Sequence, residues 1–323
     1  MRLARRAFLG LLGVALAPGS ALAQAARTPH RIGWLSTEAR PDPFVDGFRD
    51  GLQKLGYVEG RDFVLELRYT SANLDALRAA LDELVKARVA FIVSSGFAIQ
   101  ATKAVQDTTV LFAISGDPVA LGIARSLARP GGNFTGSTFM SLEVAGKRVA
   151  LLKEAVPRIR TLAALSNINH PGEPAEHRAT AEAAQAVGVK LVYAPFAALT
   201  ELDAALGGIR EARPDAVIVF PDAPTVVNRA KLAQFAVSQN LPSMFGWSEY
   251  VDAGGLMSYG ANTREAYVRL ATYADRLLRG ARAGELPIER PTRFELVVNL
   301  KTARALGITL PSPVLLAADR VIE

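Results

Sequence analysis

Small hydroxyl and glycine residues follow apolar runs in this sequence, where their donors could hold a small anion. Residues 94–96 (Ser-Ser-Gly) follow one such run, and residues 115–118 (Ser-Gly-Asp-Pro) follow another at residues 110–114. An apolar run bounded by turn residues predicts a buried parallel strand. Ser hydroxyls and backbone N–H groups at a helix N-terminus can bind a carboxylate. These residues therefore predict ligand binding at the carboxyl edge of a sheet.

Carboxylates and aromatic rings near other strand ends could complete a site for an amino acid. An α-ammonium group needs a carboxylate, and the candidates are Asp117, Asp222 and Glu249. An apolar side chain needs aromatic walls, and the candidates are Trp34, Phe220, Trp247 and Tyr259. Alternatives stay open for several of them. The two aspartates lie beside prolines and could cap helices instead, and Trp34 and Phe220 lie in apolar runs, which favours packing in the core.

The full set of predicted ligand contacts adds further hydroxyl and amide side chains at strand ends. The set is Ser36, Thr37, Ser94, Ser95, Gly96, Ser115, Gly116, Asp117, Asn167, Asp222, Trp247 and Tyr259. Within it, Ser115 and Gly116 are expected to present donors to the ligand. The role of Asp117 could be limited to capping a helix predicted to begin at Pro118.

Residue types needed for most catalysis are missing or unsuitably spaced. The sequence has no cysteine, which excludes disulfides, thiolate metal sites and a cysteine nucleophile. The histidines, His30, His170 and His177, lack metal-binding spacing, and no G-x-S-x-G motif is present. Residues 131–136 (GGNFTG) match neither of the common phosphate-binding glycine patterns. We therefore expect no catalytic residue, no metal and no cofactor.

Residues 1–23 have the three parts of a secretory signal peptide. Arginines precede an apolar run from Phe8 to Ala17, and an A-x-A cleavage site follows at residues 21–23. The run is too short to span a bilayer, which takes roughly 20 apolar residues. Residues 5–9 (RRAFL) fit the twin-arginine pattern, and export by either the Tat or the Sec route stays open. We expect a periplasmic protein without direct membrane insertion.

Composition indicates a globular protein that binds no nucleic acid. Half of the 323 residues are hydrophobic and 21% are charged, and this length allows two domains. Loss of Arg2, Arg5 and Arg6 with the signal peptide lowers the formal charge from +6 to +3. A charge this small over so long a chain is not typical of nucleic-acid binding.

Two consecutive arrays of alternating strands and helices are predicted. The strands of the first array are expected at residues 31–36, 63–69, 91–96, 110–114 and 133–139. Those of the second are expected at residues 161–167, 190–193, 216–220 and 242–247. Strands at 255–260 and 294–300 and a helix at 263–279 follow, and could join either sheet. The alternation predicts an α/β protein of two doubly wound units, each with its own parallel sheet.

With these elements in order, the chain resembles the ABC-transporter substrate-binding proteins typified by tryptophan- and tyrosine-binding lipoproteins. The resemblance covers nearly the whole chain after the signal peptide. It is carried by residues 48–60 (FRDGLQKLGYVEG), 115–119 (SGDPV), 126–136 (SLARPGGNFTG), 256–260 (LMSYG) and 294–303 (FELVVNLKTA). The sequence departs from the lipoprotein members in lacking the lipid-anchor cysteine, which favours a freely diffusing protein.

The resemblance implies the periplasmic-binding-protein type I fold, an α/β fold of two Rossmann-like, doubly wound parallel-sheet lobes. A ligand cleft would lie between the lobes, and the chain would cross between them three times. The N-terminal lobe would comprise residues 29–140 plus 258–283, and the C-terminal lobe residues 141–257 plus 284–312. The crossings would lie near residues 139–142, 256–259 and 286–291. A tail at residues 313–323 would pack on the outside.

The resemblance also implies a function in which no bond is made or broken. A monomeric solute-binding protein would capture a small polar molecule by lobe closure and deliver it to an ABC permease in the inner membrane. The expected ligand is an amino acid, with aromatic ones slightly favoured, or a related small carboxylate. Two alternatives stay open: a ligand sensor that docks on a membrane receptor kinase, and a periplasmic enzyme on the same fold.

Overall fold

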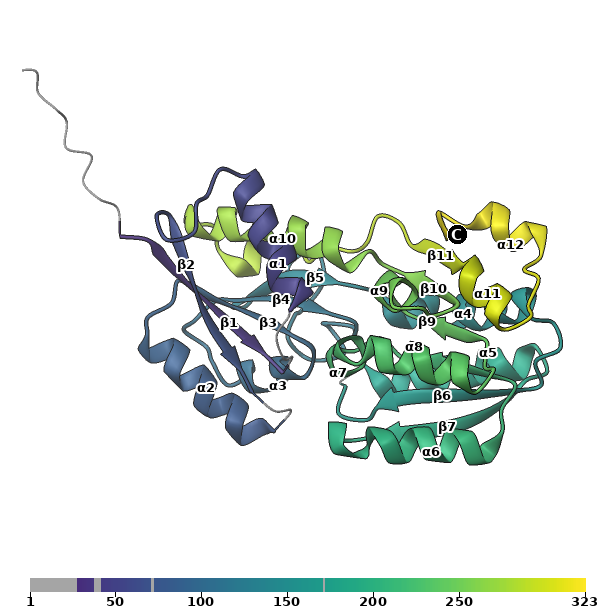
Figure 1. Ribbon diagram of the computed structural model, residues 1–323. Helices are drawn as coiled ribbons and strands as arrows, with labels where there is room; N and C mark the ends of the chain where they lie inside the picture. The colour runs from purple at the N-terminus through teal and green to yellow at the C-terminus, as the bar shows by residue number, and fades with distance from the viewer. Residues whose placement is uncertain (1–27, 38–41, 71–72, 171) are drawn as a thin grey trace, which may run out of the picture.

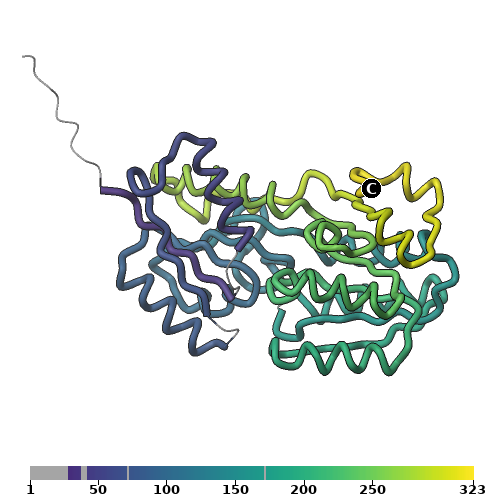
Figure 2. The backbone as a smooth tube through the Cα atoms, viewed as in Figure 1, coloured from purple at the N-terminus to yellow at the C-terminus, as the bar shows by residue number. Residues whose placement is uncertain are grey.

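The computed structural model describes residues 28–323 apart from 38–41, 71–72 and 171, and shows two α/β lobes side by side (Figures 1 and 2). The predicted signal peptide, residues 1–23, lies outside the described residues. Each lobe is built on its own sheet, and helices lie on both faces of each sheet (Figure 1). The predicted fold class is therefore confirmed.

The first lobe has a parallel sheet with the strand order β2-β1-β3-β4-β5. Its strands are β1 (His30–Ser36), β2 (Phe63–Tyr69), β3 (Phe91–Ser95), β4 (Val110–Ile114) and β5 (Phe134–Thr138). Its helices are α1 (Pro43–Lys54), α2 (Leu74–Lys86), α3 (Ile99–Thr102) and α10 (Thr263–Leu278), with short 3-10 turns η1 (Gly96–Ala98) and η3 (Ala283–Glu285). Because all strands are parallel, their carboxyl ends meet at one edge, which faces the second lobe.

The second lobe has a larger sheet with the order β12-β11-β10-β9-β8-β6-β7. Its strands are β6 (Thr161–Asn167), β7 (Lys190–Phe196), β8 (Ala216–Val219), β9 (Ser243–Phe245), β10 (Met257–Gly260), β11 (Glu295–Asn299) and β12 (Arg320–Ile322). Its helices are α4 (Ser141–Ala155), α5 (Glu173–Ala186), α6 (Leu202–Ala212), α7 (Ala223–Val227), α8 (Arg229–Ser238), α9 (Ser248–Asp252), α11 (Leu300–Ala305) and α12 (Ser312–Ala317), with the 3-10 turn η2 (Leu199–Glu201). β11 runs antiparallel to β10, whereas the other described pairs are parallel.

The boundaries of the lobes differ from the predicted ones in the last third of the chain. Ser258 to Gly260 were assigned to the N-terminal lobe, but they pair with β9 and β11 in the second sheet. The N-terminal lobe extends beyond its predicted end at residue 283. The backbone of Glu289 is still hydrogen-bonded to Gly136 and Thr138 of β5 in that lobe. The tail does not simply pack on the outside, since β12 pairs with β11 as the edge strand of the second sheet.

Residues 117–123 form turns, so the helix predicted to begin at Pro118 is wrong. The Asp117 side chain accepts a hydrogen bond from Val119 N at 2.8 Å, and its carbonyl accepts one from Leu121 N at 2.9 Å. Asp117 thus caps a turn in place of a helix. Pro118 fits the turn equally well, because its preset φ suits both conformations.

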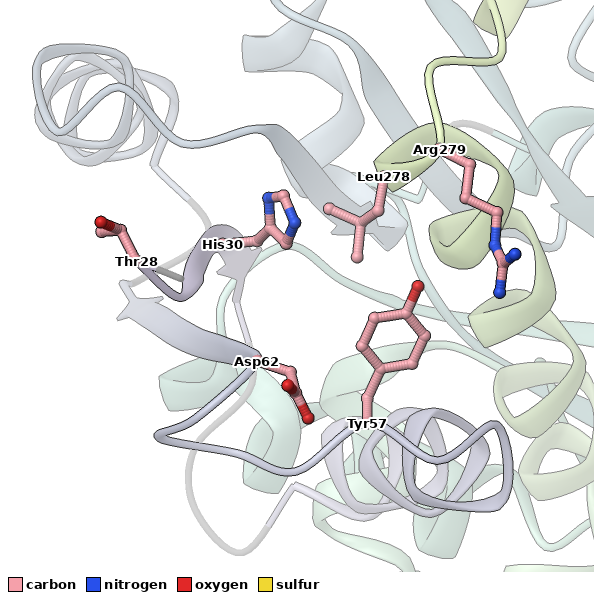
Figure 3. Close-up of a pocket in the computed structure, with 6 residues that line it drawn as sticks. All are labelled: Thr28, His30, Tyr57, Asp62, Leu278 and Arg279. Carbon is pink, nitrogen blue, oxygen red and sulfur yellow. The ribbon is translucent and has the colours of Figure 1, made fainter. Parts of the chain in front are cut away.

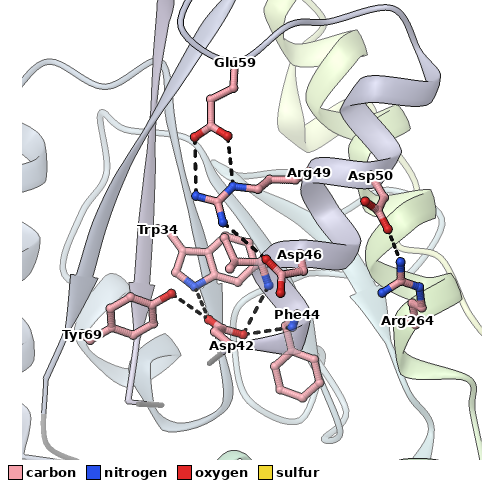
Figure 4. Close-up of polar contacts among 10 residues, drawn as sticks. Trp34, Asp42, Phe44, Asp46, Arg49, Asp50, Glu59, Tyr69 and Arg264 are labelled. Atoms are coloured by element: carbon pink, nitrogen blue, oxygen red, sulfur yellow. Dashed lines mark hydrogen bonds and ion pairs between the residues drawn. The ribbon is translucent and has the colours of Figure 1, made fainter. Parts of the chain in front are cut away.

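Helix α1 is positioned by a buried aspartate at its N-terminus. Asp42 Oδ1 accepts hydrogen bonds from the backbone of Phe44 and Val45, while Oδ2 accepts from Trp34 Nε1 at 3.1 Å and from Tyr69 OH at 3.2 Å (Figure 4). A cap of this kind satisfies N–H groups that the helix itself leaves unpaired. Asp42 therefore ties the start of α1 to β1 and β2.

A fully buried ion pair joins α4 to α5 in the second lobe. Arg148 Nη1 donates to Glu176 Oε1 at 2.7 Å, and the side chains of the two residues are only 2% and 3% exposed. Arg148 Nε also donates to the carbonyl of Tyr259 in β10 at 2.8 Å. The guanidinium therefore links two helices and the sheet.

The carboxylate of Glu249 contacts the second crossing between the lobes. Thr263 Oγ1, at the start of α10, donates to Glu249 Oε1, and Asn262 Nδ2 donates to Glu295 Oε2 at 3.3 Å. Among the described residues, Glu249 Oε2 and Glu295 Oε1 have no hydrogen-bond partner. Burial raises the pKa of Glu249, and the nearby Glu295 and Asp252 carboxylates add to the rise.

Glu176→Ala should destabilise the protein by about 3–5 kcal/mol, because Arg148 would be left buried without its counter-charge. Urea unfolding of the mature protein measures this change. Arg78→Ala is the matched control, since its pair with Asp75 is 56% and 90% exposed and should be worth less than about 1 kcal/mol. Equal effects of the two substitutions would contradict the assigned role of Arg148.

Glu249→Gln should change how stability depends on pH. Since the pKa of Glu249 is raised in the folded protein, wild-type stability falls as pH rises from the ordinary glutamate value of about 4.3 through the raised value. The glutamine side chain would keep an acceptor for Thr263 but carry no charge. The variant should therefore gain stability over wild type as pH rises above about 4.3, measured by urea unfolding, whereas the exposed Glu143→Gln should show no such trend.

Candidate functional site

The carboxyl ends of both sheets enclose a pocket between the lobes, called the interlobe pocket below. In this arrangement of the lobes, the space within it that a water-sized molecule can enter is about 10 Å³. It is lined by Phe44, Ser95, Gly96, Ala113, Ile114, Ser115, Phe139, His170, Asp222, Ala223, Trp247 and Tyr267. Segments from both lobes contribute to it, so the pocket exists only where the two lobes meet.

Four aromatic rings form one wall of the interlobe pocket. Phe44 from α1 stacks on Tyr267 from α10, with ring centroids 4.8 Å apart. Phe139, just after β5, lies 5.5 Å from Trp247 and 6.1 Å from Tyr267. Trp247 also packs edge-on against Phe44 at 6.0 Å. Such a wall offers a large apolar contact area and suits an aromatic or other flat apolar group.

Asp222 supplies a carboxylate to the same pocket. Its Oδ2 accepts a hydrogen bond from Asn167 Nδ2 at 2.5 Å, and its Oδ1 accepts one from Ala223 N at 2.8 Å. Asp222 therefore caps α7, as one of the sequence alternatives expected, and it also lines the pocket. An ionised carboxylate has about four lone-pair positions, so Asp222 can accept further hydrogen bonds from a ligand ammonium group.

A buried hydroxyl pair supports the turn that carries Asp222. Thr225 Oγ1 and Tyr250 OH lie 2.6 Å apart, and Asp222 N donates to Thr225 Oγ1 at 3.1 Å. Burial raises the pKa of Tyr250, so its phenol stays neutral at any physiological pH. The Asp222 turn is thus supported by hydrogen bonds from neutral groups, which leave the charge of its carboxylate available to a ligand.

The structure brings together part of the predicted site. Ser95, Gly96, Ser115, Asp222 and Trp247 line the interlobe pocket. Asn167 lies directly behind its wall, bonded to Asp222. The remaining predicted contacts lie outside this pocket.

Gly116 and Asp117 line an adjoining hollow between the lobes, which shares Ser115 and His170 with the interlobe pocket. At Gly116 the two lobes nearly touch: a Cβ built on Gly172 of the second lobe would lie 3.2 Å from the Cα of Gly116. Glycines at both positions allow this close approach of backbone to backbone. The cleft therefore has two compartments, which meet at Ser115 and His170.

Four other predicted contacts line neither compartment. Ser36, Thr37 and Ser94 lie at the ends of β1 and β3, and Ser94 is buried. The ring of Tyr259, the fourth of these residues, lies 6.0 Å from that of Phe294 and packs against the core of the second lobe. Tyr259 belongs to β10, which pairs with β9 and β11 in the second sheet.

Sequence reasoning missed Phe44, Phe139, His170 and Tyr267. Phe139 is the last residue of the strand predicted at residues 133–139, which ends at the same sheet edge as Ser95 and Ser115, so its position could have indicated a place in the site. Phe44 begins the helix after β1, which also places it at this edge. Tyr267 carried no such signal, because its location depends on the chain returning from the second lobe to form α10.

A larger open hollow lies at the other end of the first lobe. It is lined by Thr28, His30, Tyr57, Asp62, Leu278 and Arg279 (Figure 3). His30 begins β1, so this hollow lies at the amino edge of the sheet, opposite the cleft. Ligands of open α/β sheets bind at the carboxyl edge, which favours the interlobe pocket as the functional site.

Neither a metal-binding cluster nor a membrane-spanning helix occurs in the part of the chain that the structure describes. No group of His, Cys, Asp and Glu side chains there could hold a metal ion. Nor does any helix there combine the length and the apolar character that crossing a membrane requires.

Comparisons with known proteins agree with this fold. A tyrosine-binding protein of Clostridioides difficile (strain R20291) is 21% identical over 270 residues, covering 83% of this chain and 77% of that protein. An ABC domain from Streptococcus pneumoniae, solved in complex with L-Trp, superposes with a TM-score of 0.82 at 23% identity, covering 91% of this chain and all of that one. A conserved domain protein from Vibrio cholerae superposes with a TM-score of 0.83 at 24% identity and the same coverage of this chain.

These solved structures show that the fold is the periplasmic-binding-protein type I fold. The model of the ABC transporter substrate binding protein family matches residues 35–322, which include both lobes. This match shows the family as well as the fold. The resemblance seen in the sequence is thereby confirmed. The chain belongs to the ABC transporter substrate binding protein family.

Proposed function

We propose that this protein captures an α-amino acid with an aromatic side chain between its lobes and delivers it to an ABC permease. The observation that carries the proposal is the interlobe pocket, which combines one buried carboxylate with a wall of four aromatic rings. No bond is made or broken in this function. Binding exchanges the water around the ligand for hydrogen bonds and ring contacts.

Each part of an amino acid finds a suitable group in the pocket. Asp222 would pair with the ammonium group, and the hydroxyls of Ser95 and Ser115 would donate to the carboxylate. The aromatic wall would hold the side chain, with contacts from rings of both lobes. Because the contacts are divided between the lobes, the ligand would stabilise the closed arrangement over an open one.

Two relatives support the choice of ligand class. The Clostridioides difficile relative is named a tyrosine-binding protein, and the Streptococcus pneumoniae structure contains L-Trp. The permease partner follows from membership of the family. Export to the periplasm rests on residues 1–23, whose sequence has the features of a signal peptide.

Thermal-shift measurements on the mature protein test the ligand class. At a hundred times its dissociation constant, a bound amino acid should add about 2.7 kcal/mol of stability. Aromatic amino acids should raise the melting temperature most, and Ser115→Ala should reduce the shift. Ser238→Ala, an exposed hydroxyl on α8, is the matched control. If no amino acid gives a shift while a small organic acid does, the amino-acid proposal is wrong.

Gly172→Ala tests the close approach of the two lobes. Its Cβ would lie 3.2 Å from the Cα of Gly116 across the cleft and 3.1 Å from Cε1 of His170, which lines the pocket. These neighbours would have to give way by a few tenths of an ångström. Overpacking of this kind costs about 1–3 kcal/mol, so ligand affinity should fall by about tenfold while the melting temperature without ligand stays the same.

Calorimetric titration gives the affinities for this comparison. Gly207→Ala on α6 is the control, because a Cβ there meets no atom within 4 Å. Undiminished affinity in Gly172→Ala would show that the ligand-bound state does not require this contact between the lobes.

A further inference from the structure

Two carboxylates hold the second crossing between the lobes. The chain leaves β10 in the second lobe and returns through Ala261 and Asn262 to α10, which packs on α1 in the first lobe (Figure 1). Glu249 on α9 accepts a hydrogen bond from Thr263 Oγ1, and Glu295 on β11 accepts one from Asn262 Nδ2 at 3.3 Å. Both acids belong to the second lobe, whereas Thr263 begins a helix of the first. These contacts therefore join the lobes at the residues about which the lobes would turn.

The N-terminus of α10 suits one of these negative charges but not two. Asn262 caps the helix, since its Oδ1 accepts from Glu265 N at 2.9 Å, and a single carboxylate beside the cap is stabilised by the helix dipole. A second carboxylate adds repulsion, and burial adds a cost of desolvation. Among the described residues, Oε2 of Glu249 and Oε1 of Glu295 are buried without a hydrogen-bond partner. A proton bound by the pair removes one of the two charges.

The surrounding charged groups do not neutralise the pair. Asp252, on the same helix as Glu249, adds a third carboxylate and is itself paired with Arg320 of β12 at 2.6 Å. Arg229 lines the same surface hollow as Glu249 and donates to the carbonyl of Val226 at 2.9 Å. The other ionisable groups near the pair are Arg148 on α4, Tyr250 on α9, Arg264 and Glu265 on α10, and Asp319 before β12. Of the two arginines among them, Arg148 is paired with Glu176 and Arg264 with Asp50.

We propose that the second crossing is a proton-sensitive hinge, in which a proton held by Glu249 and Glu295 favours the closed arrangement of the lobes. Opening the cleft would turn α10 against α9 and admit water to both acids, so that both could ionise. Closure would therefore take up a proton. The pKa of Glu249 is raised in this arrangement, first by burial and further by the Glu295 and Asp252 carboxylates, which agrees with this direction. The effect on lobe closure goes beyond the proposed function, and the effect on ligand affinity rests on it.

Proton linkage gives the direction of the pH effect. A group that holds its proton more tightly in the closed state stabilises closure at low pH. That contribution is lost as pH rises from the ordinary glutamate value of about 4.3 through the raised value. Ligand affinity that depends on closure should fall across the same window and level off above it. Capture of the ligand would thus be strongest in acidic surroundings.

Energy transfer between two dyes measures lobe closure without any ligand. The chain has no cysteine, so the exposed substitutions Asp82→Cys on α2 and Ala204→Cys on α6 would place one thiol label on each lobe. In the labelled mature protein, the closed fraction should fall as pH rises above about 4.3. Glu249→Gln should abolish this trend, because glutamine keeps an acceptor for Thr263 without the charge. The exposed Glu143→Gln is the matched control and should behave as wild type.

Titration calorimetry with L-tryptophan measures the effect on binding. The affinity of wild type should fall with rising pH by up to about tenfold per pH unit, which is the limit for the exchange of one proton. Titrations in buffers of different ionisation enthalpy should show proton uptake on binding. Glu249→Gln should show neither effect, although it leaves every residue that lines the interlobe pocket unchanged.

A closed fraction that stays constant with pH in wild type would overturn the proposal, and so would an equal trend in Glu249→Gln. Glu295→Gln covers the case in which Glu249→Gln does not fold. With the neighbouring charge gone, the trend should shrink, and an undiminished trend would contradict the role of the pair. If L-tryptophan, L-tyrosine and L-phenylalanine all fail to bind at every pH while the closed fraction still responds, the proposed function is wrong and the hinge stands.

Discussion

The close packing of α1 against α10 is the constraint on which the site depends. A Cβ built on Gly51 would lie 2.4 Å from the carbonyl oxygen of Val268 and 2.6 Å from the Cβ of Ala271, so only glycine fits there. This contact joins a helix near the start of the chain to one that returns from the second lobe. It holds Phe44 and Tyr267 in a stack, and that stack is half of the aromatic wall.

The crossings between the lobes extend this constraint to the rest of the pocket. The first leaves β5 through Phe139 and Met140 into α4, and the second leaves β10 through Ala261 and Asn262 into α10. Phe139 contacts rings from both lobes, since Trp247 follows β9 and Tyr267 lies on α10. A movement of one lobe against the other would therefore change the aromatic wall directly, which couples the ligand to the arrangement of the lobes.

The sequence allowed prediction of the features that are local. Apolar runs followed by small polar residues located the strands and the edge with Ser95, Ser115, Asp222 and Trp247, because in a parallel sheet these ends must meet. The sequence did not allow prediction of which strands distant in the chain would pair. The antiparallel pairing of β11 with β10 places Tyr259 in the second sheet, packed against the core of that lobe. No periodicity distinguishes that outcome from the expected crossing. Tyr267 reaches the pocket because the chain leaves β10 and returns to the first lobe to form α10.

The chain pairs many of its buried polar groups, but not all of them. Asp42 accepts a hydrogen bond from Trp34, and Glu176 accepts one from Arg148. Among the described residues, the buried atoms without a partner include Glu249 Oε2 and Glu295 Oε1 near the second crossing, Arg148 Nη2, and Trp247 Nε1 in the interlobe pocket. An unpaired polar atom therefore does not by itself distinguish the pocket. What distinguishes the pocket is a carboxylate beside four aromatic rings, contributed by both lobes. A ligand that contacts groups of both lobes can control their closure, because those contacts form together only when the cleft is occupied.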